Sequence, residues 1–216
     1  MIYKNYFKRP LDILFCVVGL TVFSPILIIT IAAIAISFGE NPFFTQKRPG
    51  KNKKVFSVLK LKTMNSKKDS NGKLLSDTER LTPFGIFIRK TSIDELPQLI
   101  NVIIGDMSLI GPRPLLIRYL PYYTEAENRR FLIRPGITGL AQISGRNFMS
   151  WEDRFKKDLQ YMDKISFVND MKIYGQTILK VINPGEIEVD PNANPDMLAM
   201  DLERKLWPEF QHVEKN

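Results

Sequence analysis

The sequence predicts a mostly helical α+β fold, organised as a single membrane-associated domain with amphipathic helices at the membrane interface. An unbroken apolar run near the N-terminus is long enough to enter a bilayer. Apolar residues recur at helical spacing in three later segments, and one short apolar stretch has the composition of a strand. With 216 residues, of which 44% are hydrophobic, the chain can bury one packed core.

Three parts follow from these patterns. Residues 1–40 hold the apolar run and its flanks, and residues 41–185 hold the main domain. Residues 186–216 show little periodicity, so we expect them to form a loosely ordered tail.

The apolar run spans residues 11–38, with no charged residue between Asp12 and Glu40. As one straight helix it is roughly 40 Å long, enough to cross a bilayer core, whereas a buried helix is rarely apolar on every face for so long. A cleaved signal peptide is disfavoured, because the run is too long for the apolar part of an ordinary leader. A single spanning helix remains an alternative.

Ser24 and Pro25 lie in the middle of this run. Proline removes a backbone hydrogen bond and clashes with the preceding turn, so we expect the helix to bend there. Lysines and arginines flank the run on both sides, and the positive-inside rule places both flanks in the cytoplasm. These features favour a re-entrant hairpin over residues 1–40, in which the chain enters one leaflet, bends at Ser24-Pro25 and returns.

Composition narrows the chemistry open to this chain. The formal net charge of +8 indicates a negatively charged partner: nucleic acid, an anionic membrane surface or a phosphorylated substrate. Cys16 is the single cysteine and His212 the single histidine, which excludes an internal disulfide, a thiolate metal cluster, a Ser-His-Asp triad and a histidine-rich zinc site. Acid–base or metal chemistry must therefore use carboxylates, lysines or tyrosines.

The first part of the main domain contains the predicted strand. Apolar residues at five of seven positions indicate a strand over residues 55–61, with Lys60 and Lys62 on one side. Residues 65–80 are polar and rich in turn formers, so we expect a loop there.

Two adjacent carboxylates, Asp94 and Glu95, precede a helical pattern over residues 96–103. A capping box from Ser92 to Glu95 is the structural explanation, although Pro97 fits better if Asp94 is the cap, since the proline then lies in the first turn. In either case both carboxylates lie at a helix N-terminus, where the helix dipole stabilises their ionised forms.

Several arginines surround this pair in the sequence. Arg89 closely precedes it, and an ionised Asp94 beside Arg89 suits a nucleophile or a magnesium ligand. Arg113 stands between two prolines, so we expect a stiff loop to present its guanidinium for bidentate phosphate binding; an exposed arginine in a turn is the alternative. A second basic loop at 134–147 contains Arg146 and three glycines that permit close backbone approach; a plain turn is the alternative.

Two amphipathic helices are predicted after these loops. The first begins at Ser150, its expected cap, and continues through residue 162. Asp158 falls near the centre of its apolar face, so this carboxylate needs a partner, either an arginine or a metal ion. The second helix, over residues 168–182, packs on the core or lies on a membrane surface.

Four stretches of the sequence resemble one protein family. They are KLKTM, RKTSIDELPQLINVIIGDMSLIGPRP, RPGITGLAQISGRN and SWEDRFKKDLQYMDKISF. These stretches closely match the bacterial sugar transferases, which are small monotopic polyprenyl-phosphate glycosyl-1-phosphate transferases, or phosphoglycosyl transferases. The resemblance covers residues 1–182 and includes the Ser-Pro break, whereas the segment after residue 185 departs from it.

The resemblance implies that a sugar-1-phosphate moves from a nucleotide diphosphate sugar, a UDP-sugar in this family, to polyprenyl (undecaprenyl) phosphate. It implies that Asp94 attacks as a nucleophile and forms a covalent phospho-sugar intermediate, while Glu95 helps to bind metal or to activate the lipid phosphate. Mg²⁺ is the implied cofactor. Its expected ligands are Asp94, Glu95 and Asp158. The expected phosphate-binding residues are Arg89, Arg113, Arg146 and Lys60.

The resemblance also implies a re-entrant helix at the cytoplasmic face of the bacterial inner membrane and a role in the first membrane step of glycoconjugate assembly. Expected partners are the bilayer, polyprenyl phosphate and the nucleotide sugar, together with a second copy of the chain or downstream glycosyltransferases. A non-catalytic, membrane-anchored scaffold that binds anionic lipid is the alternative. Nucleic-acid binding is disfavoured, because no recognition motif is present and the apolar run argues against it.

Overall fold

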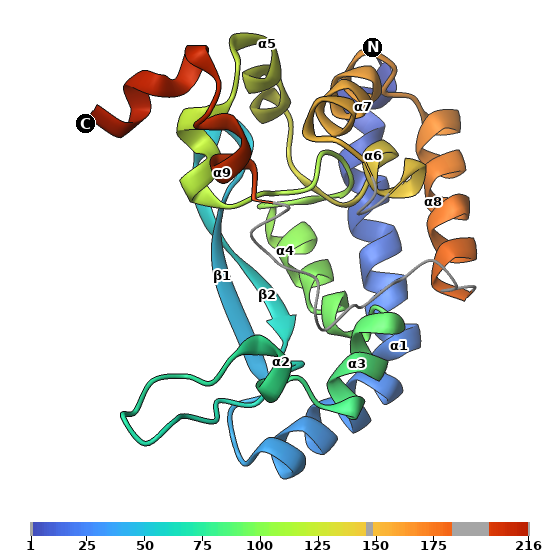
Figure 1. Ribbon diagram of the computed structural model, residues 1–216. Helices are drawn as coiled ribbons and strands as arrows, with labels where there is room; N and C mark the ends of the chain where they lie inside the picture. Colours follow the sequence, from blue (N-terminus) through green and yellow to red (C-terminus); the bar gives the residue numbers. More distant parts are fainter. Residues whose placement is uncertain (1, 146–148, 183–198, 216) are drawn as a thin grey trace.

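A computed structural model describes residues 2–145, 149–182 and 199–215 (Figure 1). The chain begins with a π-helical turn (Tyr3–Phe7) that leads into the long helix α1 (Lys8–Phe38). Strands β1 (Phe43–Pro49) and β2 (Val55–Leu61) form an antiparallel hairpin, and β3 (Ser108–Ile110) and β4 (Gly136–Thr138) form a short parallel pair. The other described α-helices are α2 (Asp77–Arg80), α3 (Pro83–Lys90), α4 (Gln98–Ile104), α5 (Glu125–Asn128), α6 (Leu140–Ser144), α7 (Trp151–Asp163), α8 (Phe167–Ile182) and α9 (Met200–Arg204).

The main core joins elements that are far apart in the sequence. Cys16 of α1, Val102 of α4 and Ile110 of β3 are almost fully buried against one another. Tyr161 of α7 and Ile173 of α8 complete this cluster. The helices predicted over 150–162 and 168–182 are therefore confirmed as α7 and α8, and both pack on the core.

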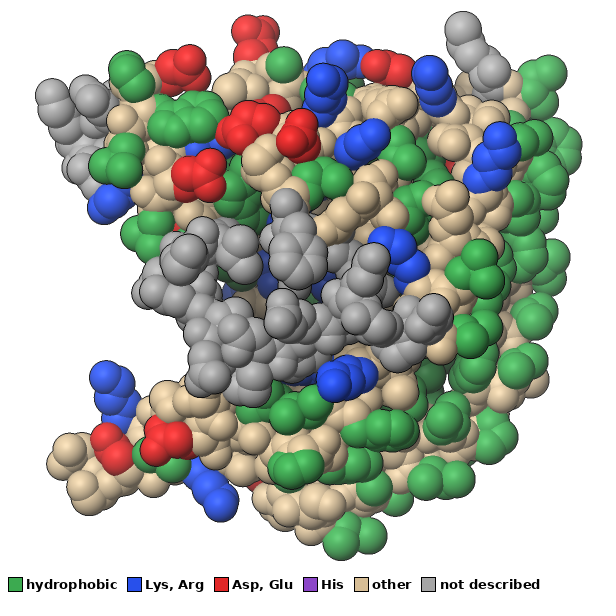
Figure 2. Space-filling view, turned by 45° about the vertical axis from the view of Figure 1, so that its right-hand side comes forward, with side chains coloured by type: hydrophobic (Ala, Val, Ile, Leu, Met, Phe, Trp, Pro, Cys, Tyr) green, Lys and Arg blue, Asp and Glu red, His purple; other side chains and the backbone are tan. Residues whose placement is uncertain are grey.

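Helix α1 presents apolar side chains to the surface along most of its length. Val22 and Ile28 are each 64% exposed, and Ile36 is 84% exposed. Among the described residues, this helix is the one long and apolar enough to cross a membrane, judged by length and composition. Hydrophobic side chains gather along the right-hand edge of Figure 2, on the side of the molecule that α1 and α8 form in Figure 1. Such an extended apolar face is rare on a soluble monomer.

The axis of α1 changes direction near the middle of the helix (Figure 1). Pro25 has no N–H to donate to the carbonyl of Thr21, and the hydroxyl of Ser24 donates to that carbonyl instead, at 2.8 Å. The expected bend is present, but the hairpin of two antiparallel halves is not: α1 is one continuous helix from Lys8 to Phe38, because Ser24 satisfies the group that the proline leaves free. Its place in a bilayer stays a prediction.

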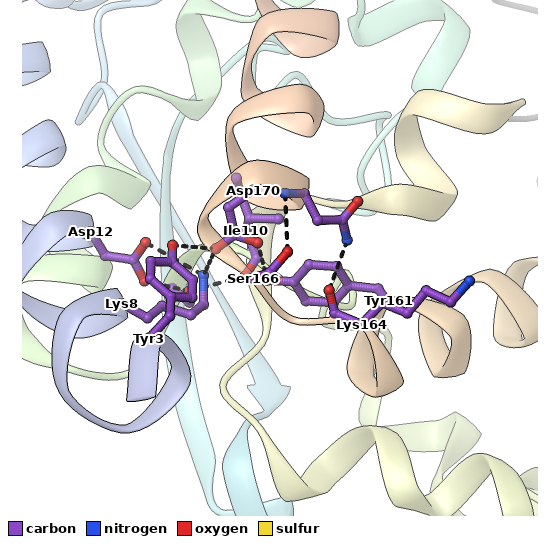
Figure 3. A network of polar contacts seen from close by, with 10 residues as sticks. Tyr3, Lys8, Asp12, Ile110, Tyr161, Lys164, Ser166 and Asp170 are labelled. Atoms are coloured by element: carbon purple, nitrogen blue, oxygen red, sulfur yellow. Dashed lines mark hydrogen bonds and ion pairs between the residues drawn. The ribbon is translucent and has the colours of Figure 1, made fainter. Parts of the chain in front are cut away.

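A buried polar network ties the start of α1 to the rest of the protein (Figure 3). Asp170 of α8, 1% exposed, accepts hydrogen bonds from Tyr3 (2.7 Å), Lys8 (2.7 Å) and Tyr161 (2.9 Å). Nearby, the buried carboxylate of Asp12 accepts a hydrogen bond from Ser108 of β3. These contacts fix the N-terminal end of α1 against α7, α8 and β3, so the apolar helix is an integral part of the fold.

The strand predicted over 55–61 is confirmed as β2, but its partner β1 is not predicted by the sequence patterns. Residues 65–80 form the expected loop for most of their length, although α2 occupies its end and begins with a capping box at Ser76. The hairpin formed by β1 and β2 carries Lys60 toward the segment that holds Asp94 and Glu95.

The described part of the C-terminal segment is ordered and packed, which corrects the prediction of a loose tail over 186–216; residues 186–198 lie outside the described residues. Helix α9 and a 3-10 segment (Pro208–Lys215) contact the 3-10 segment Ile117–Tyr122. Arg204, fully buried, donates two hydrogen bonds to Glu127, at 2.5 and 2.7 Å. This buried bidentate ion pair holds the C-terminal segment against the protein. A search for apolar periodicity cannot detect such an ion pair.

Candidate active site

Asp94 and Glu95 lie in a 3-10 turn (Ile93–Glu95) between α3 and α4. Ser92 enters this turn in the left-handed conformation, with φ of 57°, and its side chain makes no capping hydrogen bond. Helix α4 begins after Pro97. Proline has no backbone N–H, so it cannot continue the hydrogen bonding of the preceding 3-10 turn. Both capping explanations are therefore wrong, and the two carboxylates belong to a separate turn before the helix.

Glu95 is held between two cations. Lys60 of β2 and Arg113 donate to the same carboxylate oxygen of Glu95, at 2.6 and 2.8 Å. Lys60 lies 3.7 Å from a carboxylate oxygen of Asp94. The structure thus brings together four of the residues that the sequence singles out, Lys60, Asp94, Glu95 and Arg113, from three separate parts of the chain.

The environments of the two carboxylates move their pKa values in opposite directions. Asp94 is only 9% exposed. This burial, together with the neighbouring charge of Glu95, raises the pKa of Asp94 to about 6. Burial also acts on Glu95, but the charges of Arg113 and Lys60 outweigh it and hold the pKa of Glu95 well below its ordinary value. The expectation that the helix dipole favours ionisation of both groups is thus not met for Asp94, because burial dominates.

Arg89 approaches the same site from the last turn of α3. Its Nε donates to the hydroxyl of Thr63 at 2.8 Å, and its positive charge acts on the pKa of Asp94. This placement depends on Gly85, since a Cβ there would lie 1.8 Å from the carbonyl oxygen of Thr63. The close approach of α3 to the chain after β2 is thus available to glycine alone.

The loop that carries Arg113 is fixed on two sides. The amide of Gly136 donates to the carbonyl of Pro112 at 2.9 Å, and a Cβ at position 136 would lie 2.1 Å from the amide nitrogen of Gly111. On the other side, Arg130 donates to the carbonyl of Arg113 at 2.6 Å. Hydrogen bonds thus hold this loop on two sides, the glycine-rich segment lies close to the backbone of Gly111, and the side chain of Arg113 is 44% exposed.

Asp158 lies inward as predicted, at 2% exposure, and its partner is an arginine. The guanidinium of Arg130 lies 3.0 Å from its carboxylate, and burial of the pair raises the pKa of Asp158 to about 6 although the charge of Arg130 opposes the shift. The structure does not place Asp158 with Asp94 and Glu95: the described residues contain no cluster of three or more acidic, histidine or cysteine side chains that could hold a metal. Asp158 instead orients Arg130, and through Arg130 the backbone of Arg113.

A divalent cation fits the remaining pair. Asp94 and Glu95 offer hard oxygen donors, and Mg²⁺ commonly binds through one or two carboxylates together with the phosphate oxygens of a substrate. Lys60, Arg89 and Arg113 supply positive charge around these carboxylates, so a phosphorylated ligand suits the site better than a metal alone.

Not every predicted residue can be placed, and some neighbours of the site are not predicted. Arg146 lies outside the described residues. Arg48, Gln98 and Arg130 border the site or support it, and none is singled out by the sequence. Arg130 follows another arginine in a polar stretch, and Gln98 starts an apolar helix. At both positions the sequence reads like an ordinary exposed surface, so it gives no sign of a functional residue.

Comparison with known proteins shows which family this chain resembles. The family model described as bacterial sugar transferase matches residues 3–184. The chain is 50% identical over 175 residues to an uncharacterized sugar transferase, EpsL, of Bacillus subtilis, covering 81% of this chain and 87% of that protein.

Two further relatives have more specific names. The UDP-glucose:undecaprenyl-phosphate glucose-1-phosphate transferase of Caulobacter vibrioides is 35% identical, over 79% of this chain and 68% of that protein. The undecaprenyl-phosphate galactose phosphotransferase of Salmonella typhimurium is 34% identical, over 83% of this chain and 41% of that protein. The chain therefore corresponds to less than half of the Salmonella relative.

Proposed function

This chain belongs to the bacterial sugar transferase family, and on that premise we propose that it transfers a sugar-1-phosphate from a nucleotide diphosphate sugar to polyprenyl phosphate. The products are the polyprenyl-diphosphate sugar and a nucleoside monophosphate. Two relatives named for undecaprenyl phosphate support this lipid class, and one of them is named for UDP-glucose. A UDP-sugar and undecaprenyl phosphate are accordingly the proposed substrates.

Asp94 is the proposed nucleophile. A carboxylate oxygen of Asp94 attacks the β-phosphorus, the bond from that phosphorus to the bridging oxygen breaks, and UMP leaves with the bonding electrons. An oxygen of the lipid phosphate then attacks the same phosphorus, and the bond to Asp94 breaks to regenerate the carboxylate. Burial of Asp94 supports this role, because a poorly solvated carboxylate is the more reactive nucleophile once it is ionised.

Glu95 and its cations are proposed to position the phosphates. Glu95 stays ionised, held by Lys60 and Arg113, so it is a poor proton acceptor and a good fixed anchor for those two cations. Arg113, half exposed on a rigid loop, is placed to meet phosphate oxygens, and Arg89 adds charge on the other side of Asp94. Arg146 keeps its proposed phosphate-binding role on sequence grounds.

Mg²⁺ is the proposed cofactor, and Asp94 and Glu95 are the residues that would hold it. When bound, it would neutralise charge on the diphosphate and on the departing monophosphate. The chain's own residues then have two tasks: Asp94 supplies the attacking oxygen, and the surrounding lysine and arginines orient the substrate.

The membrane is the proposed location of the lipid substrate. The exposed apolar face of α1, continued by Leu179 and Ile182 on α8, supports insertion of both helices into one leaflet at the cytoplasmic face of the inner membrane. Because α1 also packs on α4, the helix that follows Asp94 and Glu95, insertion would keep these carboxylates close to the bilayer surface, where the lipid phosphate lies.

The single observation that carries the proposal is the buried Asp94 beside the Glu95 ion-pair cluster. Its test is intact-protein mass spectrometry of the chain in nanodiscs with Mg²⁺ and a panel of UDP-sugars, without lipid acceptor. We expect a mass gain of one phospho-sugar in the wild type and in an Asp163→Asn control, whose carboxylate is 57% exposed, and none in Asp94→Asn. Normal UMP release by Asp94→Asn on addition of polyprenyl phosphate would sink the assignment of Asp94 as the nucleophile. A wild type that forms no adduct and releases no UMP would favour the scaffold alternative.

A further inference from the structure

A small pocket adjoins the carboxylate pair on the side of the β1–β2 hairpin. Gln46 and Arg48 of β1 and Lys60 of β2 form one wall, because alternate residues of a strand share a face. Gln98, the first residue of α4, Arg113 and Pro114 also line the pocket. Lys60 and Arg113 are also the cations that hold Glu95, so the pocket is continuous with the site of the proposed reaction.

Gln98 is a buried amide that lacks part of its hydrogen bonding. The residue is 3% exposed, and its Nε2 has no hydrogen-bond partner among the described residues. An unsatisfied buried donor is costly and uncommon in folded proteins. A donor of this kind in a pocket wall indicates that the pocket receives a ligand with an acceptor oxygen.

Arg48 adds positive charge without a matching carboxylate. Within the described ranges no acidic side chain pairs with Arg48, and its guanidinium donates to Oε1 of Gln46 at 2.5 Å. Burial and the neighbouring charge of Arg113 lower the pKa of Arg48 to about 10. Arg48 and Arg113 both line the pocket, and their positive charges repel one another, so an anion bound in the pocket would relieve this repulsion.

The chemistry of the pocket therefore matches a phosphate group. It offers guanidinium, ammonium and amide donors. Val58, Pro114 and the aromatic ring of Phe44, which is 44% exposed and on the same face of β1, complete the lining. A tetrahedral anion with several acceptor oxygens satisfies both arginines and the free amide donor. Phe44 is suited to stack with an attached base.

We propose that this hairpin pocket binds the nucleoside monophosphate half of the donor, with Arg48 and Gln98 as ligands of its phosphate and Phe44 beside the base. The inference rests on the proposed function: if Asp94 attacks the β-phosphorus, the α-phosphate is one bridging oxygen away and must be held until UMP leaves. Arg48 and Gln98 are then binding residues for the leaving group, distinct from the residues around the attacked phosphorus.

The test compares Arg48→Gln and Gln98→Leu with Lys47→Gln, which removes the same charge from the adjacent, exposed position of β1. Binding of UMP to the nanodisc-embedded protein is measured by calorimetry, and KM values for UDP-sugar and for polyprenyl phosphate are measured separately. We expect Arg48→Gln to weaken UMP binding and to raise the KM for UDP-sugar at least tenfold, Gln98→Leu at least threefold, and Lys47→Gln less than twofold. The KM for polyprenyl phosphate is expected to stay within twofold throughout.

Each outcome decides between specific alternatives. A changed KM for the lipid phosphate with unchanged UMP binding would overturn the proposal and assign the pocket to the acceptor. Unchanged UMP binding in both variants would also overturn it, even if the wild type forms the phospho-sugar adduct. Weaker UMP binding in the variants of a protein that forms no adduct would support the pocket and refute the proposed reaction, so the two claims fail separately. Thermal melting of each variant checks folding, and Gln98→Leu retains the test if Arg48→Gln does not fold.

Discussion

Asp94 and Glu95 are neighbours in the sequence, yet Glu95 accepts hydrogen bonds from both Lys60 and Arg113 whereas Asp94 lies 3.7 Å from the nearest of these cations. One carboxylate is thereby committed to an ion-pair cluster, and the other is buried with its charge only partly compensated. This division supports the proposed roles of Glu95 as a positioning group and of Asp94 as the nucleophile, and the predictions below follow from it.

Replacing Asp94 by Asn is expected to abolish the phospho-sugar adduct and to stabilise the protein. Because the folded state raises the pKa of Asp94 from 3.8 to about 6, the ionised group costs about 3 kcal/mol above pH 6. We expect the variant to unfold at a higher temperature at pH 7.5 in EDTA. The difference should shrink toward pH 3, below the unfolded-state pKa of 3.8, where Asp94 is mostly protonated in both states. A variant less stable than the wild type at pH 7.5 would contradict this account.

The rate of adduct formation is expected to depend on the ionisation of Asp94. The pKa of Asp94 is about 6 without a bound metal, and Mg²⁺ at the site would lower it. The rate should fall about tenfold per pH unit below that lowered pKa and level off above it, because only the carboxylate attacks. Quenched-flow mass spectrometry between pH 4 and 8 measures the profile. Asp158 also has a pKa raised to about 6, so an Asp158→Asn variant serves as the control and should keep the same acid limb. A flat profile would exclude Asp94 as the titrating group.

Asp158 is expected to act on stability and not on metal binding. Removing it in Asp158→Ala leaves Arg130 charged and buried, which should cost about 3–5 kcal/mol of unfolding free energy in urea titrations. The Mg²⁺ concentration that gives half-maximal adduct formation should not change in Asp158→Asn. If that concentration rose tenfold or more, Asp158 would have to be counted among the metal ligands after all.

Arg204 is expected to anchor the C-terminal segment. In Arg204→Met, Glu127 loses both of its hydrogen bonds from the guanidinium in a buried place, and the variant should lose about 3–5 kcal/mol. The exposed pair of Arg129 and Asp163 is the matched control, since Arg129→Met should cost less than about 1 kcal/mol. Adding Glu127→Gln to Arg204→Met should recover part of the loss, as measured by chemical denaturation; no recovery would argue against an unpaired charge as the cause.

The sequence predicts those features of this fold that depend on periodic burial. Helices α7 and α8, strand β2 and the inward position of Asp158 follow from apolar spacing, and all are present. The pairing of Lys60 with Glu95 joins residues 35 positions apart, so no local pattern predicts it. Only the resemblance to the family indicates that Lys60 belongs to the site.

The features that the sequence does not predict depend on single side chains in particular surroundings. β1 contains charged and proline residues that obscure its alternation, yet seven residue pairs in register hold it against β2. The C-terminal segment lacks periodicity because one buried arginine and its aromatic neighbours, Phe155 and Trp207, fix it in place of an apolar face. The cap predicted before α4 is absent because Pro97 separates the carboxylates from the helix.

The hydrogen bond from Ser24 to the carbonyl of Thr21 has a consequence for the surroundings that the bend of α1 tolerates. The polar group freed by the proline is satisfied within the same helix, so the bend needs no water and no partner chain. The helix stays continuous through the bend, from Lys8 to Phe38, so no hydrophilic loop interrupts its apolar surface. The carbonyl of Thr21 therefore stays paired at the place inside α1 where the chemistry of proline demands another donor.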